Sequence, residues 1–242
     1  MKGVVIRENG GPGVMKLQQL ERPQVKNNEV LIKVAATSIN RFDLRQRRGW
    51  LPKLKKGESA YPGIECSGEI IAVGAGVTQW KVGDQVCALV NRGGYAEEVV
   101  VPSGQLLSVP RSVSLEDAAS LPVVACSVWL ALFQIGKLSA GQTLLVRDGC
   151  SDFGIFAIQI AKYKGAKVLV IGVVDIQMTN WEEKELTVNR VKRYVWPAIE
   201  KGQIKPVIYK NFPLSEAANA HKLMENGKFI GKILLLPDSF MS

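Results

Sequence analysis

The first 110 residues consist of short apolar or alternating runs separated by turns. Such runs predict β-strands where each is bounded by Gly, Pro or Asp. The turns include Pro62-Gly63 and Gly93-Gly94, residue types that supply turn dihedrals. The pattern indicates a β-rich, barrel-like unit, whose predicted strands are Val4–Ile6, Glu29–Ala35, Glu69–Val73, Gln85–Val90 and Tyr95–Val101.

The spacing of apolar residues becomes helical after Ser114. Ser114 and the acidic residues behind it resemble a helix cap, and an apolar helix is predicted over Val123–Ile135. A strand, a Gly-containing turn, a helix and a second strand follow, in the order of one βαβ unit. Their predicted ranges are Thr143–Val146, Asp148–Gly154, Ile155–Lys164 and Lys167–Ile171.

The last 60 residues predict a second helical stretch and a return to strands. Pro197 would kink or restart the first of these helices, and Ser215 is predicted to cap the second. The predicted elements are a helix over Lys184–Lys201, a strand over Pro206–Tyr209, a helix from Ser215 to Asn226 and a strand over Lys232–Leu236.

Composition supports a globular protein, since 47% of the 242 residues are hydrophobic and 22% are charged. Apolar runs such as Val168–Val174 are far shorter than the roughly 20 residues of a membrane-spanning helix. The N-terminus turns polar after Val4–Ile6, unlike a secretory signal. We therefore expect a cytoplasmic protein without a membrane partner.

Cysteine and histidine usage argues against a metal site. The four cysteines form no CxxC pair, and His221 is the single histidine. We expect each cysteine to be a small, buried, reduced side chain; they are Cys66, Cys87, Cys126 and Cys150.

The net charge of +9 suits an anionic partner, either a nucleotide phosphate or a nucleic acid. Much of the excess lies in the stretch Arg41–Lys56, which a solvated loop would explain equally well. No recognition motif for nucleic acid accompanies the charge. A basic nucleic-acid-binding module is thus the weakest alternative.

Four consecutive motifs carry a family resemblance. Together they resemble the zeta-crystallin-like quinone oxidoreductases, in the tumour-suppressor-inducible branch of the medium-chain dehydrogenases and reductases. The similarity covers residues 1 to about 172 and resumes near Val191. The motifs are Ala35–Asp43 (AATSINRFD), Pro62–Glu69 (PGIECSGE), Val82–Val86 (VGDQV) and Gly93–Glu98 (GGYAEE).

The resemblance implies an α/β plus β-rich fold, in which a GroES-like catalytic barrel is formed by both chain ends and a truncated Rossmann βαβ segment is inserted. Each βαβ unit of a Rossmann sheet takes about 30 residues, yet only residues 173–188 separate the two matching parts. Most of the later strands of the Rossmann sheet must therefore be missing, including the edge strands through which relatives form homodimers. The expected boundaries are 1–121 for the N-terminal GroES-like part, 122–172 for the Rossmann segment, 173–189 for a divergent junction and 190–242 for the return.

The same resemblance implies metal-free hydride transfer from NADPH to a quinone or other conjugated carbonyl. Ile64 stands where zinc-using relatives have a histidine ligand. Simpler structural roles compete at several positions: a turn cap for Asn40 and Asp43, a bond within its own helix for Ser127, and a solvated strand end for Lys232. By resemblance the catalytic positions are Asn40 and Asp43, the substrate cleft includes Trp50 and Leu51, and the cofactor positions are Ser127, Gly149, Ser151, Gly154 and Lys232.

Two carboxylates disturb the expected phosphate-binding turn. Asp152 stands where relatives usually have glycine, and Asp148 is close by. Two unit charges 4 Å apart interact by about 4 kcal/mol at an effective dielectric of 20, so we expect weakened cofactor binding that Arg147 would partly offset. Asp175 is a further candidate, for a ribose hydroxyl, although a loop carboxylate explains it more simply.

Two other polar residues are predicted to be structural. Glu65 should be buried and paired with a basic group or with backbone, and His221 should be a surface or packing residue. The chain is thus interpreted as a quinone reductase, or alternatively as an inactive truncated isoform or remnant that retains a GroES-like lobe and exposes strand edges.

Overall fold

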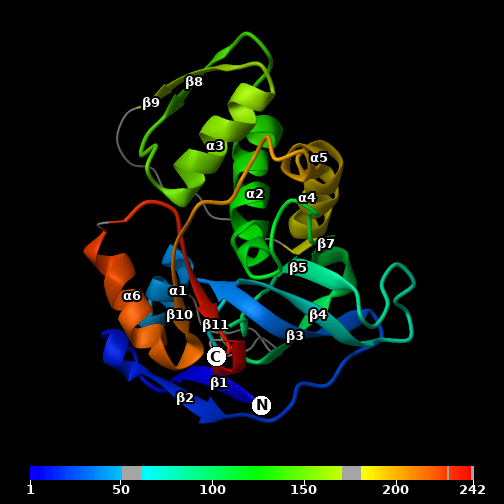
Figure 1. The fold of residues 1–242 in the computed structure, drawn as a ribbon, viewed down its shortest axis with the longest axis vertical. Helices are drawn as coiled ribbons and strands as arrows, with labels where there is room; N and C mark the ends of the chain where they lie inside the picture. Colours follow the sequence, from blue (N-terminus) through cyan, green and yellow to red (C-terminus); the bar gives the residue numbers. More distant parts are fainter. Residues whose placement is uncertain (51–60, 171–180, 228, 241–242) are drawn as a thin grey trace.

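The computed structural model describes residues 1–50, 61–170, 181–227 and 229–240 (Figure 1). Leu51 and Asp175, together with Lys53, Lys55 and Lys56 of the basic stretch, lie outside these ranges.

A seven-stranded sheet from both chain ends forms the larger lobe, as expected. Its central strand β3 pairs with β4 along one edge, and with β6 and β11 along the other. The strand order is β10-β11-β3-β4-β5-β7, with β6 off this path. The strands are β3 (Glu29–Ser38), β4 (Glu65–Val73), β5 (Gln85–Leu89), β6 (Glu98–Pro102), β7 (Leu106–Ser108), β10 (Ile208–Pro213) and β11 (Lys232–Leu236).

Two helices and a hairpin lie against this sheet. Strands β1 (Lys2–Ile6) and β2 (Met15–Gln19) pair antiparallel. Helices α1 (Arg41–Arg47) and α6 (Ala217–Asn226) come from opposite ends of the chain, yet they lie beside each other (Figure 1). Side chains of α6 pack with those of β1, β2 and β11 in one hydrophobic cluster.

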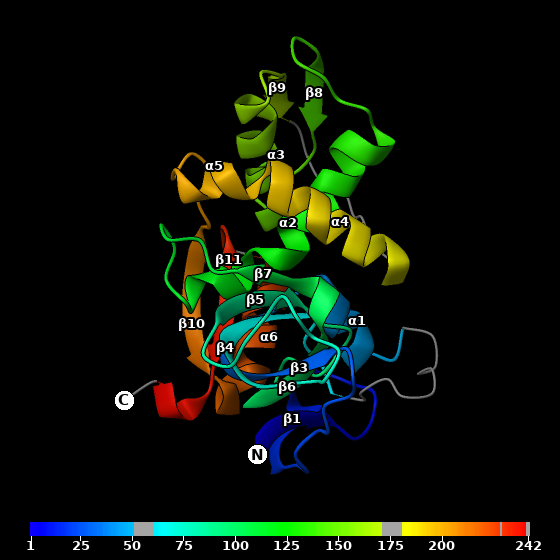
Figure 2. The ribbon, with the colours of Figure 1, turned by 90° about the vertical axis from the view of Figure 1, so that its right-hand side faces the viewer.

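The smaller lobe is a single βαβ unit. Strands β8 (Thr143–Val146) and β9 (Lys167–Val170) are parallel, and α3 (Asp152–Tyr163) connects them. In the ranges that the structure describes, these two strands pair only with each other. Figures 1 and 2 show this unit at the end of the molecule opposite β1. The described part of this sheet is therefore short, as expected because only residues 173–188 separate the two parts that match the family.

An apolar helical layer connects the two lobes (Figure 2). One hydrophobic cluster contains side chains from all of its α-helices, from α3 and from β5 of the large sheet. The layer consists of a 3-10 turn at Asp117–Ser120, α2 (Pro122–Trp129), a π-helical turn at Leu130–Ile135, α4 (Trp181–Tyr194) and α5 (Trp196–Glu200).

The stretch Asp117–Ile135 is long and apolar enough to cross a membrane, and it is longer than the apolar runs considered from sequence. About 67% of it is buried inside the protein, as a core helix would be. It does not form one regular helix, since α-helical geometry ends at Trp129.

Several predicted boundaries need correction. Helix α3 begins at Asp152 rather than Ile155, because Ser151 is its N-cap and its hydroxyl accepts a hydrogen bond from the Gly154 N–H. Ser215 caps no helix; its hydroxyl instead donates to Asp238. Pro197 does restart the helix, since it occupies the first turn of α5.

Candidate functional site

A cleft of about 300 Å³ lies between the two lobes. One wall is the turn that leads into α3, and the opposite wall is made by α1 and by the end of α6. Its lining includes Arg41, Leu44 and Arg48 from α1 and its C-cap, Asp148, Cys150, Ser151, Asp152 and Phe153 from the turn and the start of α3, and Met224, Glu225, Gly227, Phe229 and Gly231 from the α6 side. This volume is at the lower end of the range typical for ligand sites.

The turn before α3 has the tight backbone that the glycine pattern predicts. A Cβ at Gly154 would collide with the carbonyl oxygen of Asp148, so only glycine fits. Asp148 has a φ of 64°, in the left-handed region that Asp tolerates better than most residues. The Ser151 hydroxyl donates back to the Asp148 carbonyl at 2.9 Å. Gly149, Ser151 and Gly154 thus form one compact turn at the helix start.

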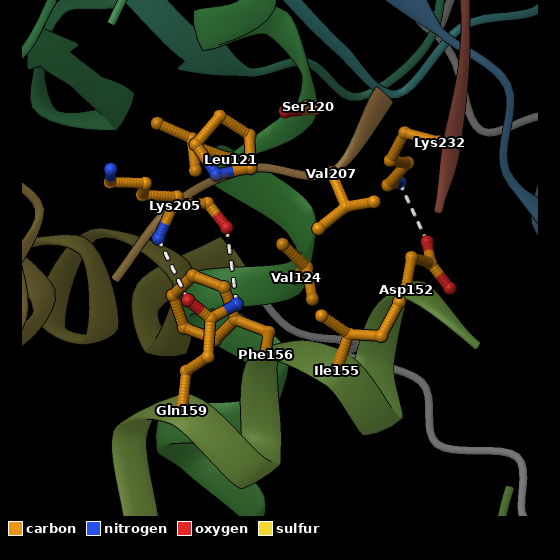
Figure 3. Close-up of a pocket in the computed structure, with 11 residues that line it drawn as sticks. Ser120, Leu121, Val124, Asp152, Ile155, Phe156, Gln159, Lys205, Val207 and Lys232 are labelled. Carbon is orange, nitrogen blue, oxygen red and sulfur yellow. Dashed lines mark hydrogen bonds and ion pairs between the residues drawn. The ribbon is translucent and has the colours of Figure 1, made fainter. Parts of the chain in front are cut away.

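Lys232 forms a buried polar cluster at the boundary between the lobes. Its ammonium donates to the Asn40 side-chain oxygen at 2.7 Å and to Glu65 at 2.8 Å. It also lies 3.0 Å from the Asp152 carboxylate, which Figure 3 shows beside a small cavity. That cavity holds about 20 Å³, enough for one water molecule. The competing interpretation of Lys232 as a solvated strand-end lysine is therefore wrong, since Lys232 is 3% exposed.

Glu65 ties this cluster to the helical layer. One carboxylate oxygen accepts from Ser38, Asn40 and Lys232, while the other accepts from the Val123 N–H at 2.8 Å. Val123 is in the first turn of α2, where a negative charge is stabilised by the helix dipole. The prediction that Glu65 is buried and paired with a basic group is confirmed.

The charge on Lys232 is retained despite its burial. Desolvation alone would lower the pKa of its ammonium. The carboxylates of Glu65 and Asp152 outweigh that effect and raise the pKa above its ordinary value. Asp152 is therefore partnered by Lys232, whereas Arg147, which was expected to offset its charge, is exposed.

Asn40 and Asp43 lie together at the start of α1. The Asn40 amide donates to Glu65 at 3.0 Å, so its side chain belongs to the Lys232 cluster. Asp43 is the third residue of α1, and its carboxylate accepts from the Asn40 N–H at 2.8 Å, which is one half of a capping box. Burial raises the pKa of Asp43 to about 7, although backbone hydrogen bonds from Asn40 and Gly63 and one from Tyr95 oppose the rise.

A second buried network extends from Asp43 and was missed from sequence. The Tyr95 hydroxyl donates to Asp43 at 3.2 Å and lies 3.0 Å from His221 Nε2. On the other side of the ring, Arg47 lies 3.3 Å from Nδ1 and also pairs with Glu225. Because Arg47 can only donate, Nδ1 accepts and Nε2 carries the proton.

This network decides between the two predicted roles of His221 and changes the interpretation of Arg47. His221 is fully buried, so it is a packing residue rather than a surface one. Burial, assisted by the Arg47 charge, lowers the pKa of His221 to about 3, and the ring stays neutral. Arg47 belongs to the basic stretch for which a solvated loop was one of two interpretations, but it is fully buried in α1. The available signal was weak: one lone histidine on an apolar helix and one arginine within a charged run.

Other predicted site residues lie elsewhere. Ser127 is buried in α2 and does not line the 300 Å³ cleft. Trp50 is 67% exposed, and the Arg48 guanidinium lies 4.9 Å from the centre of its ring. Cys150 is exposed, contrary to the expectation of burial, whereas Cys66, Cys87 and Cys126 are buried as predicted.

The donor set of the cleft suits an anionic organic ligand better than a metal. Across the described ranges, no three His, Cys, Asp or Glu side chains gather as metal ligands. The cleft instead offers the guanidinium groups of Arg41 and Arg48, opposite a tight turn at a helix N-terminus. These parts fit a dinucleotide phosphate, but the carboxylates of Asp148 and Asp152 line the same space.

Comparison with known proteins adds family information. The pattern of the alcohol dehydrogenase GroES-like domain matches residues 26–111, and that of the zinc-binding dehydrogenase matches residues 84–235. The chain is 38% identical over 162 residues to a synaptic vesicle membrane protein VAT-1 homolog from Danio rerio, covering 66% of this chain and 33% of the relative. It is 33% identical over 171 residues to the quinone oxidoreductase of Sus scrofa, covering 70% of this chain and 52% of the relative.

The structure also resembles solved ones. The Escherichia coli quinone oxidoreductase complexed with NADPH aligns with a TM-score of 0.84 at 19% identity, over 98% of this chain and 100% of that one. An identity this low shows a shared fold alone. The chain spans about half or less of the length of the two curated relatives.

Proposed function

The chain belongs to the zinc-binding dehydrogenase family, within the quinone-oxidoreductase and VAT-1-like part of the medium-chain dehydrogenases and reductases. From that membership we propose that it is an NADPH-dependent reductase of quinones or other conjugated carbonyls. The observation that supports the proposal most is the 300 Å³ cleft between the GroES-like lobe and the α3 turn. Crevices at the carboxyl ends of parallel strands are where dinucleotides bind in α/β folds.

Arg41 and Arg48 are proposed to hold the phosphates of the nucleotide. Arg41 lines the cleft from the start of α1 and Arg48 from the C-cap of the same helix. Guanidinium groups bind phosphate oxygens with charge-assisted, often paired hydrogen bonds. Arg48 also pairs with Glu225 at 2.6 Å, which holds its guanidinium at the cleft edge. Gly149, Ser151 and Gly154 would provide the turn against which the phosphates lie, and Ser127 is retained only as a proposed contact by family position.

When bound, the nicotinamide would supply the hydride. The chain's part is then to position the acceptor and to stabilise the negative charge that develops on its carbonyl oxygen. Asn40 is the polar group proposed for this task by family position, and its 2.7 Å hydrogen bond from Lys232 holds its side chain in place, while Lys232 stays a proposed cofactor contact. Asp43 acts as a positioning residue, because it holds the Asn40 backbone from the start of α1.

A cytoplasmic location belongs to the same proposal. Quinone and nucleotide are the partners it requires, whereas nucleic acid and a membrane are not needed. The family-type homodimer through further Rossmann strands is not proposed, because β8 and β9 pair only with each other in the described ranges.

The reductase is tested by following NADPH absorbance in the presence of 1,4-benzoquinone. We expect enzyme-dependent NADPH oxidation, and an Arg41→Gln variant should raise the KM for NADPH about tenfold, since a hydrogen bond to a charged group contributes roughly 1.5–3 kcal/mol. Arg22→Gln is the matched control, because Arg22 pairs with Glu98 and does not line the cleft. No oxidation by the folded protein, or equal KM values in both variants, would contradict the assignment.

A further inference from the structure

We propose that the carboxylate of Asp152 occupies the anion position at the start of α3 and thereby sets how tightly the cleft takes a nucleotide. The inference rests on the proposed function, because the nucleotide phosphate is the ligand with which this carboxylate competes. Asp152 lines both the 300 Å³ cleft and the small cavity at the lobe boundary, so it stands where the two meet.

Both oxygens of the Asp152 carboxylate accept from groups that suit a phosphate. Oδ1 accepts from the Phe153 N–H at 3.0 Å, in the first turn of α3. Oδ2 lies 3.0 Å from the Lys232 ammonium, as Figure 3 shows. Helix N-terminal amides and ammonium groups are the donors that hold phosphate oxygens in proteins. One side chain of this protein engages both of them.

The neighbouring donors are also engaged within the chain. The Gly154 N–H donates to the Ser151 hydroxyl at 3.1 Å, and the Ile155 N–H donates to the Ser151 carbonyl at 2.8 Å. Lys232 directs its remaining short hydrogen bonds to Asn40 and Glu65. A phosphate approaching Ser151 therefore meets satisfied amides and a negative charge, until the Asp152 side chain moves aside.

The same carboxylate joins the two lobes. Lys232 begins β11 in the large lobe and Asp152 begins α3 in the small one. The pair is 3% and 20% exposed, so it is shielded from solvent far more than an ordinary surface pair. Neutralising Asp152 should thus have two opposite effects: it weakens the ligand-free protein, and it removes the negative charge that an external anion meets beside Lys232.

The test compares Asp152→Asn with wild type and with Asp148→Asn as a matched control. Asparagine keeps the size of Asp152 and an oxygen for the Phe153 N–H. Asp148→Asn removes the same charge from the same cleft, at a φ of 64° that asparagine tolerates. NADPH and, separately, inorganic pyrophosphate are titrated into each full-length protein by calorimetry, and the thermal midpoint is measured without ligand.

We expect Asp152→Asn to bind NADPH and pyrophosphate at least about tenfold more tightly than wild type. Without ligand, its midpoint of thermal unfolding should be lower than that of wild type. Asp148→Asn removes a charge from the same cleft but no partner of Lys232, so it should tighten binding by a smaller factor than Asp152→Asn and leave the midpoint in place. Equal affinities in wild type and Asp152→Asn, equal tightening in both variants, or a gain for NADPH without one for pyrophosphate would each overturn the inference. If none of the folded proteins binds NADPH, the proposed function falls with it.

Discussion

Lys232 shows how distant partners decide the role of one residue. The residues next to Lys232 in the sequence suggest a solvated lysine at the start of a strand. In the structure its side chain is buried between Glu65 and Asp152. Neither partner is near it in the chain, so no local pattern could reveal the cluster. The usable signal was Glu65, because a carboxylate inside an apolar strand requires a basic or backbone partner. Sequence reasoning found that requirement but did not identify the lysine.

The Glu65–Lys232 pair should make a large contribution to stability. Removing one partner of a buried pair leaves the other charge uncompensated, which typically costs about 3–5 kcal/mol. We therefore expect Glu65→Gln to lower the free energy of unfolding by about 3 kcal/mol or more. Urea denaturation followed by circular dichroism measures this difference.

The control is the exposed pair Arg22–Glu98, in which Arg22 is 61% exposed. Arg22→Gln should change the free energy of unfolding by less than about 1 kcal/mol. Similar effects of the two substitutions would show that the Lys232 cluster is not the buried, coupled unit described above.

His221 permits an unambiguous pH test, because it is the single histidine in the chain. Its pKa is about 3 in the folded protein, against about 6.5 in an unfolded chain. The unfolded state therefore binds a proton first as pH falls, so this residue's contribution to stability is present above pH 6.5 and is lost progressively towards pH 3.

The measurement is the proton NMR titration of the His221 ring. We expect no titration of the native ring between pH 8 and pH 5, with the proton on Nε2. A native midpoint near 6.5 would contradict the buried contacts to Arg47 and Tyr95.

At the scale of elements, the hydrophobic pattern predicted whether a segment is a helix or a strand better than it predicted where that segment begins and ends. The βαβ order and both C-terminal strands were predicted, because period and turn residues are local signals. The helix starts were not: the Ser151 hydroxyl caps α3 three residues early, whereas Ser215 bonds to Asp238 instead of a helix end. Strands β2 and β7 were missed, since β7 has three residues and the largely polar β2 (MKLQQ) depends on pairing with β1.

The β8–β9 sheet should promote self-association. Leu145 and Leu169 are paired across the two strands and are 53% and 59% exposed. An open, apolar sheet of this kind favours contact with another chain. We expect the double variant Leu145→Thr with Leu169→Thr to shift the protein towards monomer in sedimentation velocity.

Val82→Thr is the matched control for that experiment. Val82 is also exposed, at 57%, but it lies in the turn before β5 rather than in an open sheet. Self-association that persists in the leucine variant, or that falls equally in the control, would contradict a role for the β8–β9 face.

For the whole molecule, the shortened chain still brings its two lobes together around a cleft. The fold class and the use of both chain ends in one sheet were predicted through the family motifs, which are contiguous in sequence. The cleft itself could not be predicted, because α1, the α3 turn and the end of α6 meet only after the chain has folded. Function therefore depends on whether this arrangement holds a nucleotide with fewer Rossmann strands than the two-half Rossmann sheet contains.

The central claim is tested most directly by calorimetric titration of NADPH into the folded wild-type chain, at low and moderate salt. The account predicts one-to-one binding that weakens as salt rises, since Arg41 and Arg48 supply charge to the phosphates. Absence of any binding heat, from protein shown to be folded by circular dichroism, would contradict the account and leave a GroES-like lobe without its family's chemistry.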